Sequence, residues 1–285
     1  MHAASSHLYK KRRFINTIGL TLSMGSMVIG LLALLWILLV LFGNGLAALD
    51  FAIFTNDTPA PGSDGGGLRN AIVGSLMIVG LAVLVSTPVG ILAGVYLTEF
   101  GDTSKLAGIT RFITDIMLSA PSIVLGLFVY AIAVATVGNF SGYAGSLALA
   151  LIAIPVVMRT TENMLRLVPG SLREAAFAVG APRWKVATMV TLRAAKSGVI
   201  TGLLLAIARI SGETAPLLFT ALNNQFFSTK MDAPMANLPV VIFQFAMSPY
   251  ENWIRLAWAG ALLITLTVLV LNILARVFFR EKVSG

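Results

Sequence analysis

Residues 169–192 read PGSLREAAFAVGAPRWKVATMVTL. The Pro-Gly pair at the start breaks the chain, and Ser171 followed by Glu174 has the form of a capping box, which predicts a helix start. Gly180 suits the end of that helix, and Pro182 suits the first position of a second one. The stretch therefore predicts two short helices joined at a glycine, with apolar side chains on their surface. Such a surface needs a partner or must fold back on the chain.

The chain around this segment has the composition of a polytopic membrane protein. Of its 285 residues, 57% are hydrophobic and 11% are charged, whereas an ordinary globular chain carries about a quarter charged residues. Apolar segments of roughly 20 residues, the length that crosses a bilayer as a helix, recur along it. We therefore predict an all-α membrane bundle of six transmembrane helices, at residues 17–42, 70–98, 112–136, 143–158, 198–222 and 256–279.

The basic residues orient these spans. With the N-terminus in the cytoplasm, 16 Lys and Arg fall on the cytoplasmic side and three on the outer side, with Arg209 left inside a span. This bias follows the positive-inside rule, so we expect both termini and the loop 159–197 to be cytoplasmic. We divide the chain into residues 1–69, which hold the tail, first span and outer loop, and a membrane core at 70–280 that includes loop 159–197.

Several classes of function are excluded. The sequence has no cysteine, which removes disulfides and Cys-ligated metal sites, and its two histidines, His2 and His7, are too few for a metal centre. It has no GxxxxGK[ST] phosphate-binding loop and no plausible nucleophile–base set. The first apolar run is too long for a cleavable signal peptide. We expect no catalytic residue, metal or cofactor, and therefore a transporter component rather than an enzyme.

The helical pair within loop 159–197 resembles the EAA loop of bacterial ABC import permeases. The residues that carry the resemblance are Glu174, Ala175, Ala176 and Gly180, with Val190 and Leu192 further on. Two positions depart from the family pattern, since Arg193 replaces its final proline and Val190 its usual isoleucine. The resemblance implies the type I ABC importer permease fold, in which this loop docks into a groove on an ATPase subunit. The alternative is an ordinary amphipathic hairpin at the membrane interface.

Further segments resemble the PstA family, the permeases of phosphate-specific ABC transporters: RTTENML at 159–165, ARISGETAPLL at 208–218, LSAPSIV at 118–124 and ANLP at 236–239. This resemblance implies import of inorganic phosphate across the bacterial inner membrane. It also implies a PstC-like sister permease, two copies of a PstB-like ATPase and a PstS-like phosphate-binding protein. A permease for another oxyanion or small solute, a secondary transporter and a non-transporting scaffold are the alternatives.

Charged residues within the spans are the candidate substrate contacts, because each costs roughly 2.5–3.5 kcal/mol to insert. Arg209 and Glu213 are four residues apart, so we expect them on one helix face. We predict that Arg209 contacts an anion in the translocation path, since guanidinium suits phosphate oxygens, and that Glu213 orients it. The alternative is an ion pair that only fixes helix packing. Arg159, at the end of the fourth predicted span, either lines the path or extends to the interface.

Overall fold

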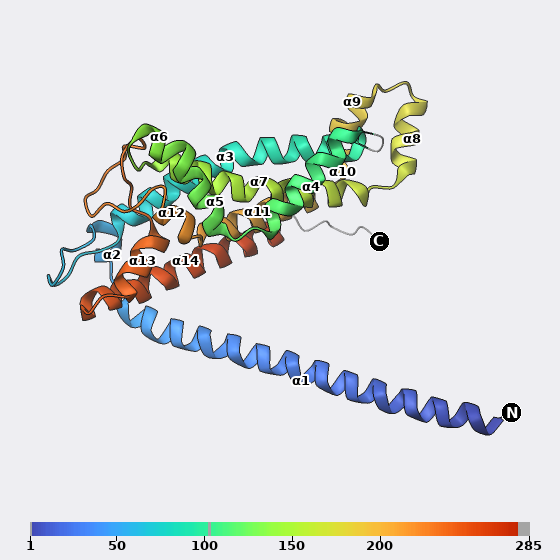
Figure 1. Ribbon diagram of the computed structural model, residues 1–285, viewed down its shortest axis with the longest axis horizontal. Coiled ribbons are helices and arrows are strands. Elements are labelled where there is room, and N and C mark those ends of the chain that lie inside the picture. The colour runs from blue at the N-terminus through green and yellow to red at the C-terminus, as the bar shows by residue number, and fades with distance from the viewer. Residues whose placement is uncertain (1, 102–103, 279–285) are drawn as a thin grey trace.

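The computed structural model describes residues 2–101 and 104–278, and all regular secondary structure in these residues is helical (Figure 1). The predicted all-α class is confirmed. The elements are α1 (His2–Ala48), α2 (Ala52–Thr55), α3 (Arg69–Glu99), α4 (Lys105–Ser119), α5 (Ser122–Val129), the π-helix η1 (Tyr130–Val134), α6 (Ala135–Val137), α7 (Gly142–Arg166), α8 (Gly170–Ala178), α9 (Arg183–Lys185), the π-helix η2 (Val186–Thr191), α10 (Leu192–Ala194), α11 (Lys196–Ser211), α12 (Ala215–Leu218), α13 (Leu238–Ala246) and α14 (Glu251–Phe278).

Four helices, α1, α3, α7 and α14, are long and apolar enough to cross a membrane, and two bent pairs raise the number of candidate spans to six in the described residues. One bent pair is α4 with α5–α6, which replaces the predicted span at 112–136 and turns by 107°. The bend falls at Ala120, whose extended ψ of 137° fits its place before Pro121, because proline disfavours the helical conformation in the preceding residue. The other pair, residues 183–194 with α11, turns by 73°.

The centre of the bundle is the close packing of α3 against α7. A Cβ atom at Gly90 would lie 2.7 Å from Cβ of Val157, and one at Gly94 would lie 2.7 Å from Cβ of Thr161. The equal steps along both helices show that they run parallel, as expected of the second and fourth spans. Small residues allow membrane helices to approach closely, and here they bring the two backbones together.

Helix α11 packs against α7 in the opposite direction. A Cβ atom at Gly202 would meet Thr160, and one at Gly198 would meet Met164. The predicted single span 198–222 is nevertheless wrong, because α11 ends at Ser211 and residues 212–214 are not helical. Pro216 then begins the separate short helix α12, where its missing N–H costs no helical hydrogen bond.

The two predicted long outer loops lie at one end of the bundle, beside α2 and α13, and the α8–α9 segment lies at the other end (Figure 1). The segment between α12 and α14 is packed, in agreement with the prediction. The ring of Phe245 stacks on Trp253 with centroids 4.3 Å apart, and Asn237 caps α13 by accepting a hydrogen bond from the Val240 N–H at 3.1 Å.

Helix α1 stands apart from the other helices (Figure 1). It meets the bundle near its C-terminal end, where Leu41 and Ala48 are buried and Gly45 lies against Leu262 of α14. The rest of the chain buries none of its apolar 18-residue stretch.

Candidate functional site

Residues 170–194, which we term the hairpin, project from the end of the bundle opposite the loops (Figure 1). Helix α8 begins at Gly170 after Pro169, and no side chain caps it, so the predicted capping box of Ser171 and Glu174 is wrong. Its end is as predicted. Gly180 adopts a φ of +80°, and the Ala181 N–H donates to the Ala176 carbonyl at 3.1 Å, a glycine-terminated helix end.

The hairpin exposes apolar side chains at the end of the molecule, as the sequence predicted. These are Leu172, Phe177, Val179, Trp184 and Met189, which are between 44% and 83% exposed. Of the residues that carry the EAA resemblance, Glu174, Ala175 and Gly180 are exposed and Ala176 is partly exposed. Exposed apolar side chains gathered on one short segment are typical of a surface that contacts a partner.

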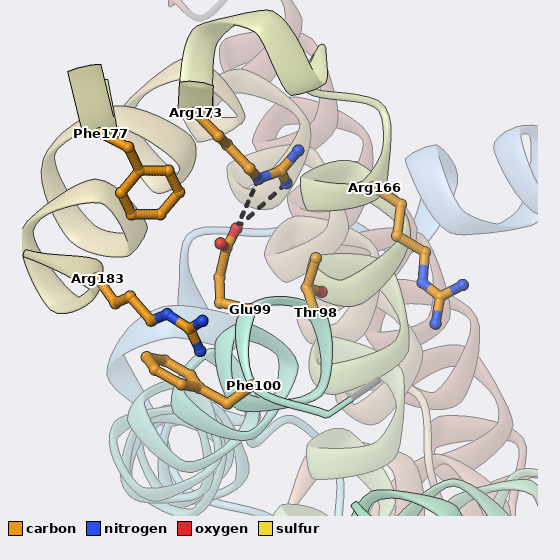
Figure 2. A pocket seen from close by; sticks show the side chains of 7 residues that line it. All are labelled: Thr98, Glu99, Phe100, Arg166, Arg173, Phe177 and Arg183. Carbon is orange, nitrogen blue, oxygen red and sulfur yellow. Dashed lines mark hydrogen bonds and ion pairs between the residues drawn. The ribbon is translucent and has the colours of Figure 1, made fainter. Parts of the chain in front are cut away.

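Beneath the hairpin is a polar pocket of about 590 Å³ (Figure 2). Its walls come from the end of α3, the end of α7 and the hairpin, through Thr98, Glu99, Phe100, Arg166, Arg173, Phe177 and Arg183. Figure 2 shows Arg173 and Glu99 pointing toward each other, joined by an ion pair of 3.1 Å.

A second group of charges, which we term the Glu162 cluster, lies at the same end of the bundle. It comprises Arg111 and Asp115 of α4 and Arg159, Glu162 and Arg166 of α7. Glu162 is only 2% exposed, and its Oε1 accepts hydrogen bonds from Arg111 at 2.8 Å and Arg166 at 2.7 Å. A buried carboxylate requires such partners, because a buried charge without them is costly.

Arg159 belongs to this cluster. Its guanidinium lies 3.2 Å from the Asp115 carboxylate and 3.5 Å from Oε2 of Glu162. It does not end its span as predicted, because α7 continues to Arg166. Arg159 is held by carboxylates on two helices, Asp115 of α4 and Glu162 of α7.

Arg209 is in the last turn of α11, and its side chain is exposed. The expected pairing with Glu213 on one helix face is wrong, because the helix ends between them and no ion pair joins them among the described residues. Glu213 lies in the break before α12 and is partly exposed. The alternative, an Arg209–Glu213 ion pair that only fixes helix packing, has no support in this arrangement.

Arg209 and Arg159 lie at different heights along the axis of the bundle. Gly202 faces Thr160 and Gly198 faces Met164 in the antiparallel packing of α11 on α7. Continued along the helices, this register places Arg159 roughly 9 Å nearer the hairpin than Arg209, at 1.5 Å rise per residue.

Two helix breaks lie next to each other near Arg209. Leu118, just before the α4–α5 bend, packs against the apolar cluster that contains Ala206 of α11. On the other side of both breaks, a Cβ atom at Gly126 of α5 would lie 2.6 Å from Cα of Pro216 in α12. Irregular backbone at membrane depth is tolerated only where protein buries it or where it borders a water-filled cavity.

Comparison with known proteins now identifies the chain's relatives. A protein-family model described as "Binding-protein-dependent transport system inner membrane component" matches residues 86–282. The phosphate transport system permease protein PstA of Yersinia pestis is 59% identical over 271 residues, which cover 95% of this chain and 92% of the relative. The chain belongs to the PstA family of binding-protein-dependent permeases.

This permease aligns end to end with the phosphate transport system permease protein PstA of Xylella fastidiosa strain Temecula1. The two are 52% identical over 287 residues, with 100% of each chain covered. The family description makes it a multi-pass inner-membrane protein of an ABC transporter. The predicted family membership is confirmed.

Solved structures confirm the ABC importer permease fold. An inward-facing MetNI methionine ABC transporter structure has a TM-score of 0.60 at 21% identity, covering 74% of the permease and 95% of that chain. An amino acid ABC transporter crystallised with histidines has a TM-score of 0.57 at 16% identity, covering 75% and 92%.

Sequence reasoning missed the centre of the Glu162 cluster and the Arg173–Glu99 pair. Glu162 had a readable signal, because Arg159 and Arg166 flank it at spacings of three and four on an apolar helix, which places all three on one face. Glu99 and Arg173 are far apart in sequence, so no local spacing could have indicated their contact.

Proposed function

We propose that the chain is the membrane permease subunit of an ATP-driven importer that translocates inorganic phosphate. The observation that carries this proposal is the 52–59% identity, over at least 95% of the chain, to permeases named for phosphate transport. Its partners are a PstC-like sister permease, two PstB-like ATPase copies that hydrolyse the ATP, and a PstS-like phosphate-binding protein. A permease for another oxyanion or small solute is the second candidate, favoured only by the fold shared with amino acid importers.

The hairpin is the proposed ATPase-docking element. Glu174, Ala175, Ala176 and Gly180 form the docking turn within its exposed apolar surface. We place this surface in the cytoplasm, where ATP is available. Both termini lie on the same side in this arrangement, as the distribution of basic residues requires.

Arg209 is the proposed phosphate contact. Its side chain is exposed, has no ion pair among the described residues and lies directly before the break between α11 and α12. A guanidinium without a carboxylate partner keeps its donors for an anion, and its planar fork fits two phosphate oxygens. We place Glu213 beside the path and Arg159 further along it, toward the hairpin.

The test is uptake of labelled phosphate by proteoliposomes that contain all four kinds of subunit, with sulfate and molybdate as competitors. We expect ATP-dependent phosphate uptake that neither competitor suppresses. Suppression by either competitor, or absence of phosphate uptake by an assembled complex with active ATPase, would favour the second candidate.

A matched set of variants tests Arg209. Arg209→Gln should assemble at the wild-type level, because no ion pair is lost, and should abolish uptake. Arg209→Lys keeps the charge without the fork and should retain partial activity. Arg255→Gln removes another exposed arginine, on α14, and should transport normally. If Arg209→Gln combined with Glu213→Gln transports at the wild-type rate, Arg209 does not contact the substrate.

A further inference from the structure

Helix α8 carries proposed docking residues, yet few apolar contacts attach it to the bundle. None of its nine residues is buried. Its packing within the chain is against η2, the other arm of the hairpin. A helix with few buried apolar contacts opens or shifts at low free-energy cost. Movement of α8 can reach α11 through η2 and α10, which lead into that helix, whereas a direct connection from α8 to the end of α3 depends on polar contacts.

Arg173 provides these contacts. Its side chain is 21% exposed, and its Nε and Nη2 donate to Oε1 of Glu99 at 3.2 and 3.1 Å. Nη1 donates to the Val168 carbonyl and Nη2 to the Leu165 carbonyl, both at 2.8 Å. One side chain of α8 is thus bound to the last residue of α3 and to the chain at the end of α7.

The chemistry of these contacts favours a rigid connection. The last carbonyls of a helix have no partner within it, and a cation at this end also interacts favourably with the helix dipole. The guanidinium satisfies two carbonyls and a carboxylate at once, and its donors are fixed in one plane. Glu99 is only 10% exposed, so solvent screens this pair less than an ion pair on the surface.

No other ion pair in the described residues joins the hairpin to α3. The pocket of about 590 Å³ occupies the space between α8 and the end of α3. In Figure 2 the Arg173–Glu99 pair crosses that space, while Arg166 points away from it. Arg166 instead binds Glu162. Arg183, the third arginine of the pocket, has no ion pair among the described residues.

The end of α3 is in turn fastened to the rest of the bundle. The Leu97 carbonyl accepts a hydrogen bond from Arg111 at 2.8 Å, and Arg111 also binds Glu162. Through its glycines, α3 lies directly against α7. A displacement imposed on Glu99 therefore acts on the central helix pair and on the helix that leads to the α4–α5 bend.

We propose that Arg173 is a positioning residue that transmits movement of the ATPase-docked hairpin to α3 and α7. The inference rests on the proposed function, because it assumes that the hairpin docks an ATPase. Arg173 itself faces the bundle rather than the exposed docking surface. Its loss should leave docking and ATP hydrolysis in place but disconnect them from the transmembrane helices.

The experiment uses the complete importer and a readout that does not depend on the substrate. The permease has no cysteine, so Thr214→Cys, in the break before α12, provides a single thiol. The rate of thiol labelling is measured with and without ATP in the background of Arg173→Gln, Glu99→Gln and Arg173→Lys. Co-purification of the ATPase and the rate of ATP hydrolysis are measured on the same samples.

The matched control is Arg69→Gln. Arg69 forms an ion pair with Asp57 through two hydrogen bonds of 3.0 Å each, at the opposite end of the bundle. The Arg69→Gln variant also removes an arginine–carboxylate pair, but it does so without touching the hairpin. It should leave the ATP-dependent change in labelling at its wild-type size.

Arg173→Gln and Glu99→Gln should each reduce the ATP-dependent change in labelling by at least about fivefold, with the ATPase still bound and active. Arg173→Lys should retain part of the change, because it keeps the charge. A change of wild-type size in Arg173→Gln would overturn the proposal. So would loss of the ATPase from both glutamine variants, which would make Arg173 a docking or folding residue. Glu99→Gln leaves the hairpin sequence intact and so decides the matter if Arg173→Gln fails to insert. Failure of the wild-type complex to take up phosphate would refute the substrate assignment only.

Discussion

Glu162 shows how a single residue organises the hairpin end of the bundle. One buried carboxylate is shared by arginines from α4 and from both sides along α7. Its Oε2 accepts no hydrogen bond in the described part of the chain, and the Arg159 guanidinium lies 3.5 Å from that oxygen. Asp115 brings a second carboxylate to Arg159. The cluster therefore joins α4 to α7 through charge, in addition to the apolar cluster that includes Ala107 and Met158.

Glu162→Gln should destabilise the permease strongly. It leaves up to three guanidiniums without their shared carboxylate, and removing one partner of a buried ion pair costs about 3–5 kcal/mol. We expect a lower midpoint of thermal unfolding in detergent and a lower level in the membrane. Asp64→Asn, in an exposed loop, is the control and should change neither. Equal midpoints for the two variants would show that the cluster does not stabilise the fold.

For single residues, the sequence predicted correctly those features that depend only on neighbours in the sequence. The positive φ of Gly180 follows from its place between two helices, and the structure confirms it. The predicted pairing of Arg209 with Glu213 was wrong because it assumed a continuous helix. Residues four apart lie on the same face only when both belong to one helix. The partners of Glu162 and Arg173 come from other helices, which one-dimensional spacing does not reveal.

At the scale of the hairpin, two substitutions test docking. Ala175→Asp puts a charge into the exposed apolar surface, and Gly180→Val puts a β-branched residue at a φ of +80°. Both should abolish ATPase co-purification and uptake while the permease still inserts. Gly108→Val, in α4 and outside the hairpin, is the control, because a Cβ atom there meets open space at an ordinary φ. Normal recovery of the ATPase with both test variants would show that docking occurs elsewhere.

The α3–α7 contact gives a second test among the elements. Gly94→Ala places a methyl group 2.7 Å from Cβ of Thr161 and 2.9 Å from the Met158 carbonyl oxygen, which should cost about 1–3 kcal/mol in packing strain. Gly80→Ala, in the same helix, meets nothing within 4 Å and should stabilise by about 0.5–1 kcal/mol. Thermal unfolding of the two proteins checks the difference. A similar loss of thermal stability in both variants would mean that helix flexibility, rather than the close contact with α7, determines the change in stability.

The helices themselves were largely predictable, and their breaks were not. Apolar runs located α3, α7 and α14 because a bilayer requires about 20 apolar residues in sequence. Hydropathy gave no signal at Ala120, since the residues there are apolar or small on both sides of the break. At the end of α11, the charged Arg209 and Glu213 were instead interpreted as members of one helix. A proline in the sequence allows either outcome. Pro88 and Pro155 lie inside continuous helices, whereas Pro121 and Pro216 begin new ones.

At the scale of the whole molecule, orientation can be tested with single cysteines in the cysteine-free chain. Ser63→Cys lies in an exposed turn beside α2, and Ser171→Cys lies on α8 at the opposite end. In intact cells, a membrane-impermeant thiol reagent should label Ser63→Cys and not Ser171→Cys. Permeabilised cells provide the control, since both should then react. Labelling of Ser171→Cys from outside intact cells would reverse the proposed topology.

The length of α1 has a consequence for its depth in the bilayer. Its membrane-compatible segment, Leu8–Ala48, has 41 residues and is roughly 60 Å long, about twice the hydrocarbon thickness of about 30 Å. Even a tilt of about 40°, the upper end of the range for membrane helices, accommodates only about 26 residues. The remaining residues, which include the basic run 10–13, must therefore lie in the headgroup layer or beyond it. Because only the last turns of α1 are fastened to α14, the helix can change tilt with bilayer thickness, whereas the glycine contacts of α3 fix its depth relative to α7.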